Sequence, residues 1–233
     1  MLAVTLIGSR DIDDEEEKLL VTCGAHAVMS GMEVYSGGAI GSDDASERGA
    51  FAAADGNQEL IERIKILLPR DGFNDKYEKH DQVCQYNGYI NVKMDPAYYS
   101  ARIISLAYHP MLKGFRDSHG IDGARGYMSN KQKATHDFMS RNVFQILGPR
   151  LSKPTDLVIC CASGSEFDDK GRLMNVTGGT GAAVRMAYDF GIPALNIRVS
   201  SHRKLIEAYL RHPEVTFQML QKLGRLNNVN ATN

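Results

Sequence analysis

Five short apolar runs recur along the chain, and longer polar or amphipathic segments separate them. The runs cover residues 2–7, 32–35, 64–68, 156–162 and 194–199. Most are continuous stretches of Val, Ile, Leu and other apolar residues, the pattern of strands that are buried on both faces of a parallel sheet. We therefore predict five β-strands, of which residues 156–162 show the pattern most clearly.

Segments with helical periodicity lie between and after these runs. Residues 14–30 place Leu19, Leu20, Cys23 and Ala27 on one face, and Gly31 suits the end of that helix. The alanine-rich segment 43–54 predicts a helix that packs close to the sheet. Further helices are predicted over residues 96–108, 135–147, 182–190 and 201–210, with a weaker one reaching residue 223. Residues 113–130 are predicted to be a long loop.

Strands that alternate with helices indicate an α/β fold with a parallel sheet and right-handed crossovers. We predict a Rossmann-like, doubly wound sheet with strand order 3-2-1-4-5. A single domain spans residues 1–226, with an inserted helical and loop segment at about 73–130. The Asn-rich residues 227–233 are predicted to be a disordered tail.

Glycine-rich segments follow two of the strands and precede two of the helices. We call residues 36–42 the first glycine loop and residues 177–181 the second glycine loop. In a doubly wound sheet, ligands bind beyond the carboxyl ends of the strands, where the winding reverses. Loop N–H groups and helix N-termini at that place favour an anion. The two loops and the end of the first strand are therefore predicted to form one crevice.

The candidate ligand-binding residues come from these loops and from the helix over residues 135–147. They are Gly8, Ser9, Arg10, Ser36, Gly37, Gly38, Ala39, Gly41, Ser42, Asp43, Arg141, Asn142, Gly178, Gly179, Thr180 and Gly181.

Several of these residues admit two interpretations. Arg10 can hold a phosphate bidentately or pair with an acidic residue at the surface. Asp43 can accept ribose hydroxyls or cap its own helix. Arg141 and Asn142 can reach the ligand, or Arg141 can be an exposed helix charge. Asp44 and Glu47 are expected to face solvent.

The composition adds limits to this picture. Of 233 residues 43% are apolar, which suits one sizeable core, and the net charge of −1 gives no overall basic field for nucleic acid. The charge is uneven, because the first 60 residues carry twelve Asp or Glu against three Lys or Arg. The four cysteines show no CxxC spacing, so we predict reduced thiols in a cytoplasmic protein and no metal site. No segment is apolar and long enough to predict membrane insertion.

Neither glycine loop has the Gly-Lys-Ser/Thr ending of a P-loop, and neither is a GxGxxG with an acid about twenty residues later. No cofactor is identified from these motifs. The expected partner is a nucleotide or a nucleotide-derived small molecule.

Several segments resemble the SLOG superfamily. Residues 36–43, together with Arg48, Gly49 and Ala50, resemble the glycine-rich signature of the DprA branch, and residues 7–10 resemble the YpsA branch. Residues 140–148, 156–161 and 177–181 resemble DprA-like proteins encoded by bacteriophages. The resemblance covers about 1–70 and 135–198, and it implies the Rossmann-like fold, a nucleotide-type pocket and a homodimer or higher homo-oligomer in the host cytoplasm.

The chain departs from the family at chemically important positions. Ile40 and Glu47 stand where the DprA signature has Arg and His. DprA proteins bind single-stranded DNA, and the loss of a cation and the gain of an acid weaken the expectation that this chain does so. Arg185 stands where the LOG branch has the carboxylate of its phosphoribohydrolases. The resemblance thus leaves three functions open: binding, sequestering or processing a nucleotide; a DprA-like mediator that binds single-stranded DNA; and a nucleotide hydrolase with an unassigned carboxylate. The span 113–141, with six Lys or Arg against three Asp, is the best local support for DNA binding.

Overall fold

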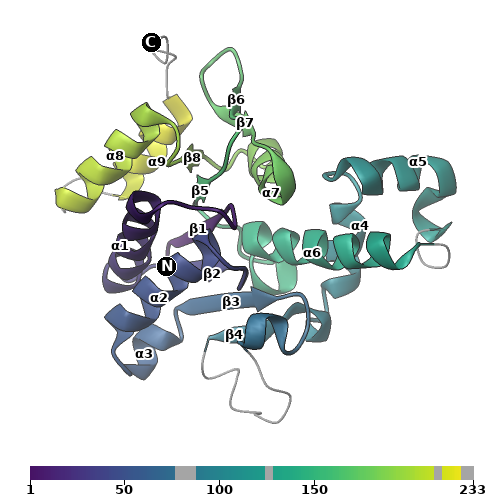
Figure 1. The fold of residues 1–233 in the computed structure, drawn as a ribbon, viewed down its shortest axis with the longest axis horizontal. Helices are drawn as coiled ribbons and strands as arrows, with labels where there is room; N and C mark the ends of the chain where they lie inside the picture. The colour runs from purple at the N-terminus through teal and green to yellow at the C-terminus, as the bar shows by residue number, and fades with distance from the viewer. Residues whose placement is uncertain (77–87, 124–127, 213–216, 227–233) are drawn as a thin grey trace.

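A six-stranded parallel sheet forms the centre of the computed structural model, which describes residues 1–76, 88–123, 128–212 and 217–226 (Figure 1). The strand order is β4-β3-β2-β1-β5-β8. These strands are β1 (Ala3–Gly8), β2 (Glu33–Ser36), β3 (Ile64–Leu68), β4 (Tyr89–Asn91), β5 (Leu157–Cys161) and β8 (Ala194–Asn196). The predicted α/β class and the predicted order of five strands are confirmed, and β4 adds an edge strand that was not predicted.

The central strand β1 marks the place where the winding of the sheet reverses. Val4 pairs with Val34 of β2 on one side and with Leu157 of β5 on the other. The next strands along the chain continue outward from β2 to β3, whereas β5 and β8 lie on the opposite side. The carboxyl ends of β1 and β5 therefore face a switch point, where an α/β sheet commonly binds its ligand.

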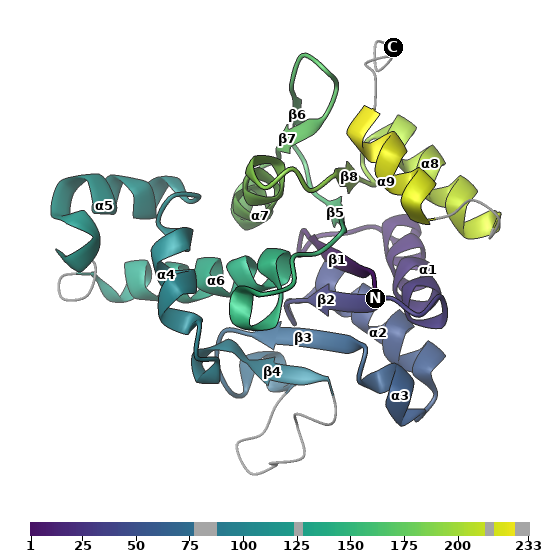
Figure 2. The ribbon, with the colours of Figure 1, turned by 180° about the vertical axis from the view of Figure 1, so that it is seen from behind.

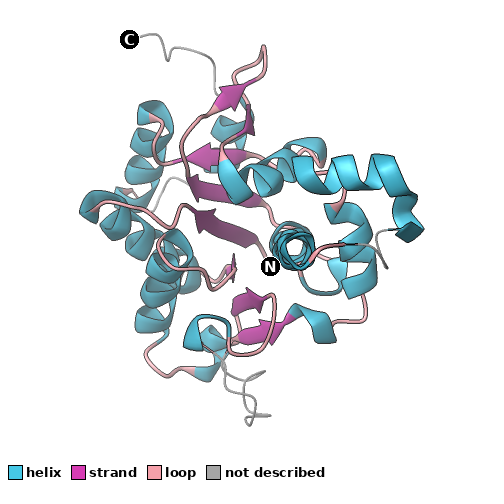
Figure 3. Ribbon diagram, turned by 45° about the vertical axis from the view of Figure 1, so that its right-hand side comes forward, coloured by secondary structure: helices cyan, strands magenta, loops and turns pink. Residues whose placement is uncertain are grey.

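Helices cover both faces of the sheet (Figure 3). One apolar cluster joins the strands to α1 (Asp14–Met29), α2 (Ser42–Ala54), α8 (Ser200–Arg211) and α9 (Phe217–Leu226). A second cluster on the other face joins them to α4 (Tyr98–Ser105), α6 (Asn130–Leu147) and α7 (Gly178–Asp189). Strands between two such layers are buried on both sides, which explains their continuous apolar sequence. A short helix, α3 (Gln58–Ile61), precedes β3.

Part of the predicted insertion joins the sheet, and another part forms a helical arm. The edge strand β4 pairs with β3, and α5 (Pro110–Gly123) occupies residues that were predicted to be loop. Leu112 and Phe115 of α5 are buried in a third apolar cluster with Leu106 and Met139, so a tertiary contact stabilises a segment that contains glycines. In Figures 1 and 2, α4, α5 and the N-terminal half of α6 extend together away from the sheet.

Several element boundaries also differ from the prediction. Helix α6 begins five residues earlier than predicted, at Asn130, because Ser129 and Gln132 form a capping box. The predicted last strand ends at Asn196, whose amide group bonds the backbone of Ala162 on the adjacent strand end. A small hairpin of β6 (Glu166–Phe167) and β7 (Leu173–Asn175) lies between β5 and α7.

Cys23, Cys160 and Cys161 are buried free thiols, and burial raises the pKa of Cys23 to about 12. Cys84 and the predicted disordered tail lie outside the described residues. In the part of the chain that the structure describes, no helix has both the length and the apolar character that crossing a bilayer requires.

Candidate functional site

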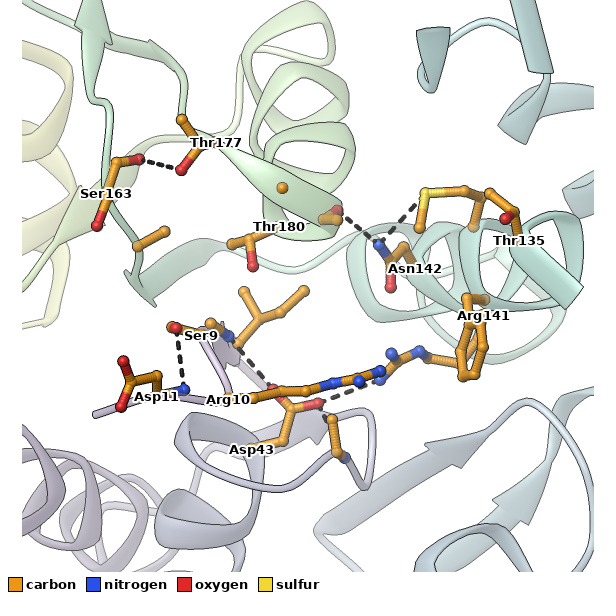
Figure 4. Close-up of a pocket in the computed structure, with 18 residues that line it drawn as sticks. Ser9, Arg10, Asp11, Asp43, Thr135, Arg141, Asn142, Ser163, Thr177 and Thr180 are labelled. Carbon is orange, nitrogen blue, oxygen red and sulfur yellow. Dashed lines mark hydrogen bonds and ion pairs between the residues drawn. The ribbon is translucent and has the colours of Figure 1, made fainter. Parts of the chain in front are cut away.

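A cavity of about 510 Å³ lies at the carboxyl ends of β1 and β5 (Figure 4). The end of β1 and the segment after it supply Gly8 to Asp11, and α6 supplies residues on the opposite side. The third side is formed by Ala162 and Ser163 after β5 and by the N-terminus of α7. The structure therefore gives the crevice three sides at the predicted place in the fold.

Two arginines and one aspartate form the charged floor of the cavity. The Arg141 guanidinium donates from Nη1 to Oδ2 of Asp43 at 3.1 Å, and these side chains are only 8% and 2% exposed. Asp43 also accepts from the backbone N–H groups of Gly8 and Ala39, each at 3.3 Å. The exposed Arg10 side chain reaches across Asp43 toward Arg141 in Figure 4. Arg141 thus pairs with Asp43, and a second cation, Arg10, lies beside this pair on the floor of the cavity.

Burial changes the charge balance of this floor. It raises the pKa of Asp43, although Arg141 and the two N–H donors oppose the shift. Burial also lowers the pKa of Arg141, against the pull of Asp43. Asp43 and Arg141 therefore stabilise each other in their charged forms, because either charge would be destabilising if it were buried without its partner.

The first glycine loop encloses Arg141 more than it faces the cavity. A Cβ atom on Gly37 would lie 1.3 Å from Nη1 of Arg141 and 2.8 Å from Oδ2 of Asp43. Only a residue without a side chain leaves room for the buried ion pair here. The absence of a side chain at residue 37 therefore serves the packing of the protein itself.

Glu47 is buried behind the same loop, so the prediction that it faces solvent was wrong. One carboxylate oxygen accepts from Ser36 Oγ and from the Gly38 N–H, both at 2.8 Å. The other oxygen pairs with Lys76 Nζ at 2.5 Å. Burial raises the pKa of Glu47 to about 7, and Lys76 opposes that shift. Asp44 is partly exposed and also contacts Lys76.

Asn74 completes the support of the first glycine loop by donating from Nδ2 to the Gly38 carbonyl at 2.7 Å. The loop N–H and C=O groups of Gly38 are thus both bonded to side chains of the protein. Glu47, which is paired with Lys76, holds the loop in place through these hydrogen bonds. This structural role explains why an acid stands at residue 47.

The second glycine loop has the opposite environment. Gly178, Gly179, Thr180 and Gly181 form the first turn of α7, whereas the sequence had predicted a helix start at residue 182. The N-cap hydroxyl of Thr177 donates to the Ser163 carbonyl at 3.0 Å and makes no capping bond to the helix. The first N–H groups of a helix have no acceptor within it, and the helix dipole adds positive potential there. This end of α7 opens into the cavity through Gly178, Gly179 and Thr180.

The structure brings most of the predicted site residues together and places the others behind them. The predicted residues that line the cavity are Gly8, Ser9, Arg10, Ala39, Asp43, Arg141, Asn142, Gly178, Gly179 and Thr180. Those outside its lining are Ser36, Gly37, Gly38, Gly41, Ser42 and Gly181. Asp43 makes no side-chain bond that caps α2, since its carboxylate accepts from Gly8, Ala39 and Arg141.

Sequence reasoning missed a row of lining residues on α6. Thr135, Phe138 and Met139 line the cavity together with Asn142. Residues three and four apart share a helix face. Extending the helix face from Asn142 toward the N-terminus would have identified all three. Asp11, Ser163 and Thr177 were also missed, although each directly continues a polar strand end or precedes a glycine.

The described residues show neither a carboxylate at the LOG position nor a cluster of metal ligands. Arg185, at the position of the hydrolase carboxylate in the LOG branch, donates to the Tyr108 carbonyl at 2.7 Å and does not line the cavity. Asp11 and Asp43 are the carboxylates that line it. Across the described ranges, no three His, Cys, Asp or Glu side chains gather in a way that could hold a metal ion.

No protein-family model matches the chain, and no curated protein sequence matches it. Among solved structures, it is similar to DNA processing protein A from Helicobacter pylori, a protein with a unique mode of binding single-stranded DNA. The identity is 15%, the match covers 90% of this chain and 80% of the other, and the TM-score is 0.46. A similarity at this level carries no argument about function, which has to rest on the cavity. The SLOG resemblance stays a prediction.

Proposed function

We propose that the protein binds a nucleotide or a nucleotide-derived small molecule in this cavity. The observation that carries the proposal is the convergence of Arg10, Arg141 and the N-terminus of α7 on one cavity. Asp43 neutralises only one of the two arginines. The oxygens of a phosphate match both guanidinium groups and helix N–H groups.

The size and lining of the cavity agree with a ligand of this class. Small-molecule sites usually measure about 300–1,000 Å³ and combine apolar walls with a few polar groups. Here Ile7, Phe138 and Met139 provide apolar surface beside the charged floor. A nucleotide offers an anionic end for the floor and α7, and a flat base for the apolar wall on α6.

Calorimetric titration with nucleoside mono- and diphosphates, NAD derivatives and cyclic oligonucleotides tests this proposal. We expect at least one of these ligands to bind, and Arg10→Ala to weaken it about 10- to 100-fold, as expected for a charge-assisted hydrogen bond. Gly179→Asp should have a similar or larger effect, because its carboxylate would repel a phosphate at α7. An acid in the first turn suits the helix dipole, so this variant should still fold. Unchanged binding in both variants would contradict the assigned pocket.

A single-stranded nucleic acid is the second candidate. Lys113, Lys131 and Lys133 are exposed on α5 and α6, the arm whose inner side reaches the cavity at Thr135. The arm offers less charge than its sequence suggests, because Arg116 pairs with Asp117 and Arg141 is buried against Asp43. Gel-shift assays at several salt concentrations test this function, since phosphate contacts with a strand make affinity fall steeply with salt. Absence of any salt-dependent binding at moderate ionic strength would exclude it.

A further inference from the structure

Two residues of the cavity lining carry a buried side-chain atom that has no hydrogen-bond partner anywhere in the described residues: Nε of Arg141 and Oδ1 of Asn142. Of these two residues, Asn142 holds the acceptor. The residue is only 3% exposed, and it belongs to the lining of the cavity. Buried amide oxygens normally accept a hydrogen bond, and leaving one without a partner is destabilising. Such an atom in the wall of a ligand cavity indicates that a donor arrives with the ligand.

The orientation of this amide is fixed by its other end. Nδ2 of Asn142 donates to the carbonyl of Gly179 at 3.1 Å and also approaches Sδ of Met139 at 4.0 Å. A flipped amide would set two oxygen acceptors against each other at Gly179, so this orientation is the stable one. In Figure 4 the oxygen of Asn142 accordingly points away from α7.

The same contact places this acceptor beside the proposed phosphate site. The Gly179 carbonyl holds Asn142, and Gly179 belongs to the first turn of α7, whose N–H groups face the cavity. The acceptor and the anion site are therefore adjacent. A hydroxyl on the sugar that carries the phosphate fits this adjacency, whereas the amino group of a base lies farther from the phosphate.

We propose that Oδ1 of Asn142 accepts a hydrogen bond from the 2′- or 3′-hydroxyl of the bound nucleotide, so that the protein discriminates against a nucleotide that lacks this hydroxyl. This inference rests on the proposed function, since it assigns a second contact to the ligand whose phosphate lies at α7. Asn142 then has two roles. Its Nδ2 fixes the first turn of α7, and its Oδ1 contacts the sugar.

Affinity measurements with ligands that each lack one group test the assignment. The probes are AMP, its 2′-deoxy and 3′-deoxy analogues, IMP, which lacks the amino group of the base, and inorganic phosphate. We expect the wild-type protein to bind one of the two deoxy analogues about tenfold or more weakly than AMP, and IMP about as tightly as AMP. Equal affinity for AMP and both deoxy analogues would overturn the inference without any mutation. A loss seen with IMP alone would also overturn it and would assign the acceptor to the base.

Asn142→Leu extends the test to the residue. The ratio between AMP and the weaker deoxy analogue should fall to about one in this variant, while the affinity for inorganic phosphate changes much less. Gln145→Leu is the matched control, because Gln145 is a buried amide one turn later on α6 that does not line the cavity. It should keep the full wild-type ratio. A ratio that survives in a folded Asn142→Leu variant would refute the role of Asn142.

The outcomes also separate this inference from the proposed function. If no phosphate-bearing ligand binds the wild-type protein, the proposed function itself fails. If nucleotides bind and Arg10→Ala weakens them, but deoxy analogues bind equally well, only the sugar contact is refuted.

Discussion

The two glycine loops look alike in the sequence but have opposite roles in the structure. In the first loop, the space left by Gly37 is filled by Arg141, and both backbone groups of Gly38 are bonded to Glu47 and Asn74. In the second loop, a Cβ atom on Gly179 would meet only the terminal methyl group of Met139, at 3.6 Å. The first loop is occupied by the protein, whereas the second is open to a ligand.

A glycine loop is an anion site only where its backbone N–H groups remain available. Gly38 and Ala39 donate to Glu47 and Asp43, so the acids of α2 take the place that a phosphate would have. The cavity at the N-terminus of α7 is lined by two acids, of which Asp43 is paired with Arg141 and Asp11 is exposed. We therefore expect loss of stability from changes in the first loop and loss of ligand binding from changes in the second.

The largest expected effect is the loss of the ion pair under the first loop. Arg141→Met removes the partner of a buried carboxylate, and we expect the free energy of unfolding to fall by about 3–5 kcal/mol. Chemical denaturation measures this. The double variant Arg141→Met with Asp43→Asn leaves no unpaired charge, so it should be more stable than Arg141→Met alone. A double variant that is less stable than the single one would contradict the buried pair.

A matched pair of alanine substitutions compares the loops directly. Gly37→Ala should destabilise the protein by about 3 kcal/mol, because its methyl group overlaps the Arg141 guanidinium. Gly179→Ala has room for its methyl group and replaces a glycine in a helix, so stability should stay the same or rise by up to about 1 kcal/mol. Thermal or urea unfolding of both variants decides the point. Equal losses would show that the two loops do not differ in packing.

Glu47 gives the first loop a pH dependence that the second loop lacks. Its pKa in the folded protein is about 7, above the ordinary value of 4.5, so the folded state binds the proton more tightly. The stabilisation from that proton is full below pH 4.5 and is lost as the pH rises through 7. Linkage then predicts that this group costs about 2 kcal/mol of stability between pH 5.5 and 8.

Glu47→Gln tests that dependence, because the amide mimics the protonated acid. Unfolding in urea at pH 5.5 and at pH 8 should show a smaller difference in stability for the variant than for the wild type. The same slope in both proteins would mean that Glu47 does not titrate in this range.

The sequence was sufficient to predict five strands of the sheet, their order and the position of the cavity. Continuous apolar strands and intervening helices fix a doubly wound order, and that order brings Arg10, Asp43 and the end of α7 to one place. What the pattern could not show was which loop would be filled. That depends on Arg141, 98 residues after Asp43, and on Lys76, 29 residues after Glu47. Such contacts exist only once the chain is folded.

The missed elements have equally physical causes. Three residues of β4 carry too short a pattern to identify a strand, and pairing with β3 stabilises it. Helix α5 was not predicted because Gly114 and Gly120 lower the helical preference of its sequence. The burial of Leu112 and Phe115 stabilises it. In each case tertiary contacts outweigh weak local preference.

We infer that a phosphate-bearing ligand contacts the second glycine loop and not the first. Titrating an isotope-labelled sample with AMP, or with the tightest ligand of the panel, while following backbone amide resonances tests this claim directly. We expect the amide resonances of Gly179 and Thr180 to shift most and those of Gly37 and Gly38 to shift little. The largest shifts at Gly37 and Gly38, with Gly179 unchanged, would contradict it.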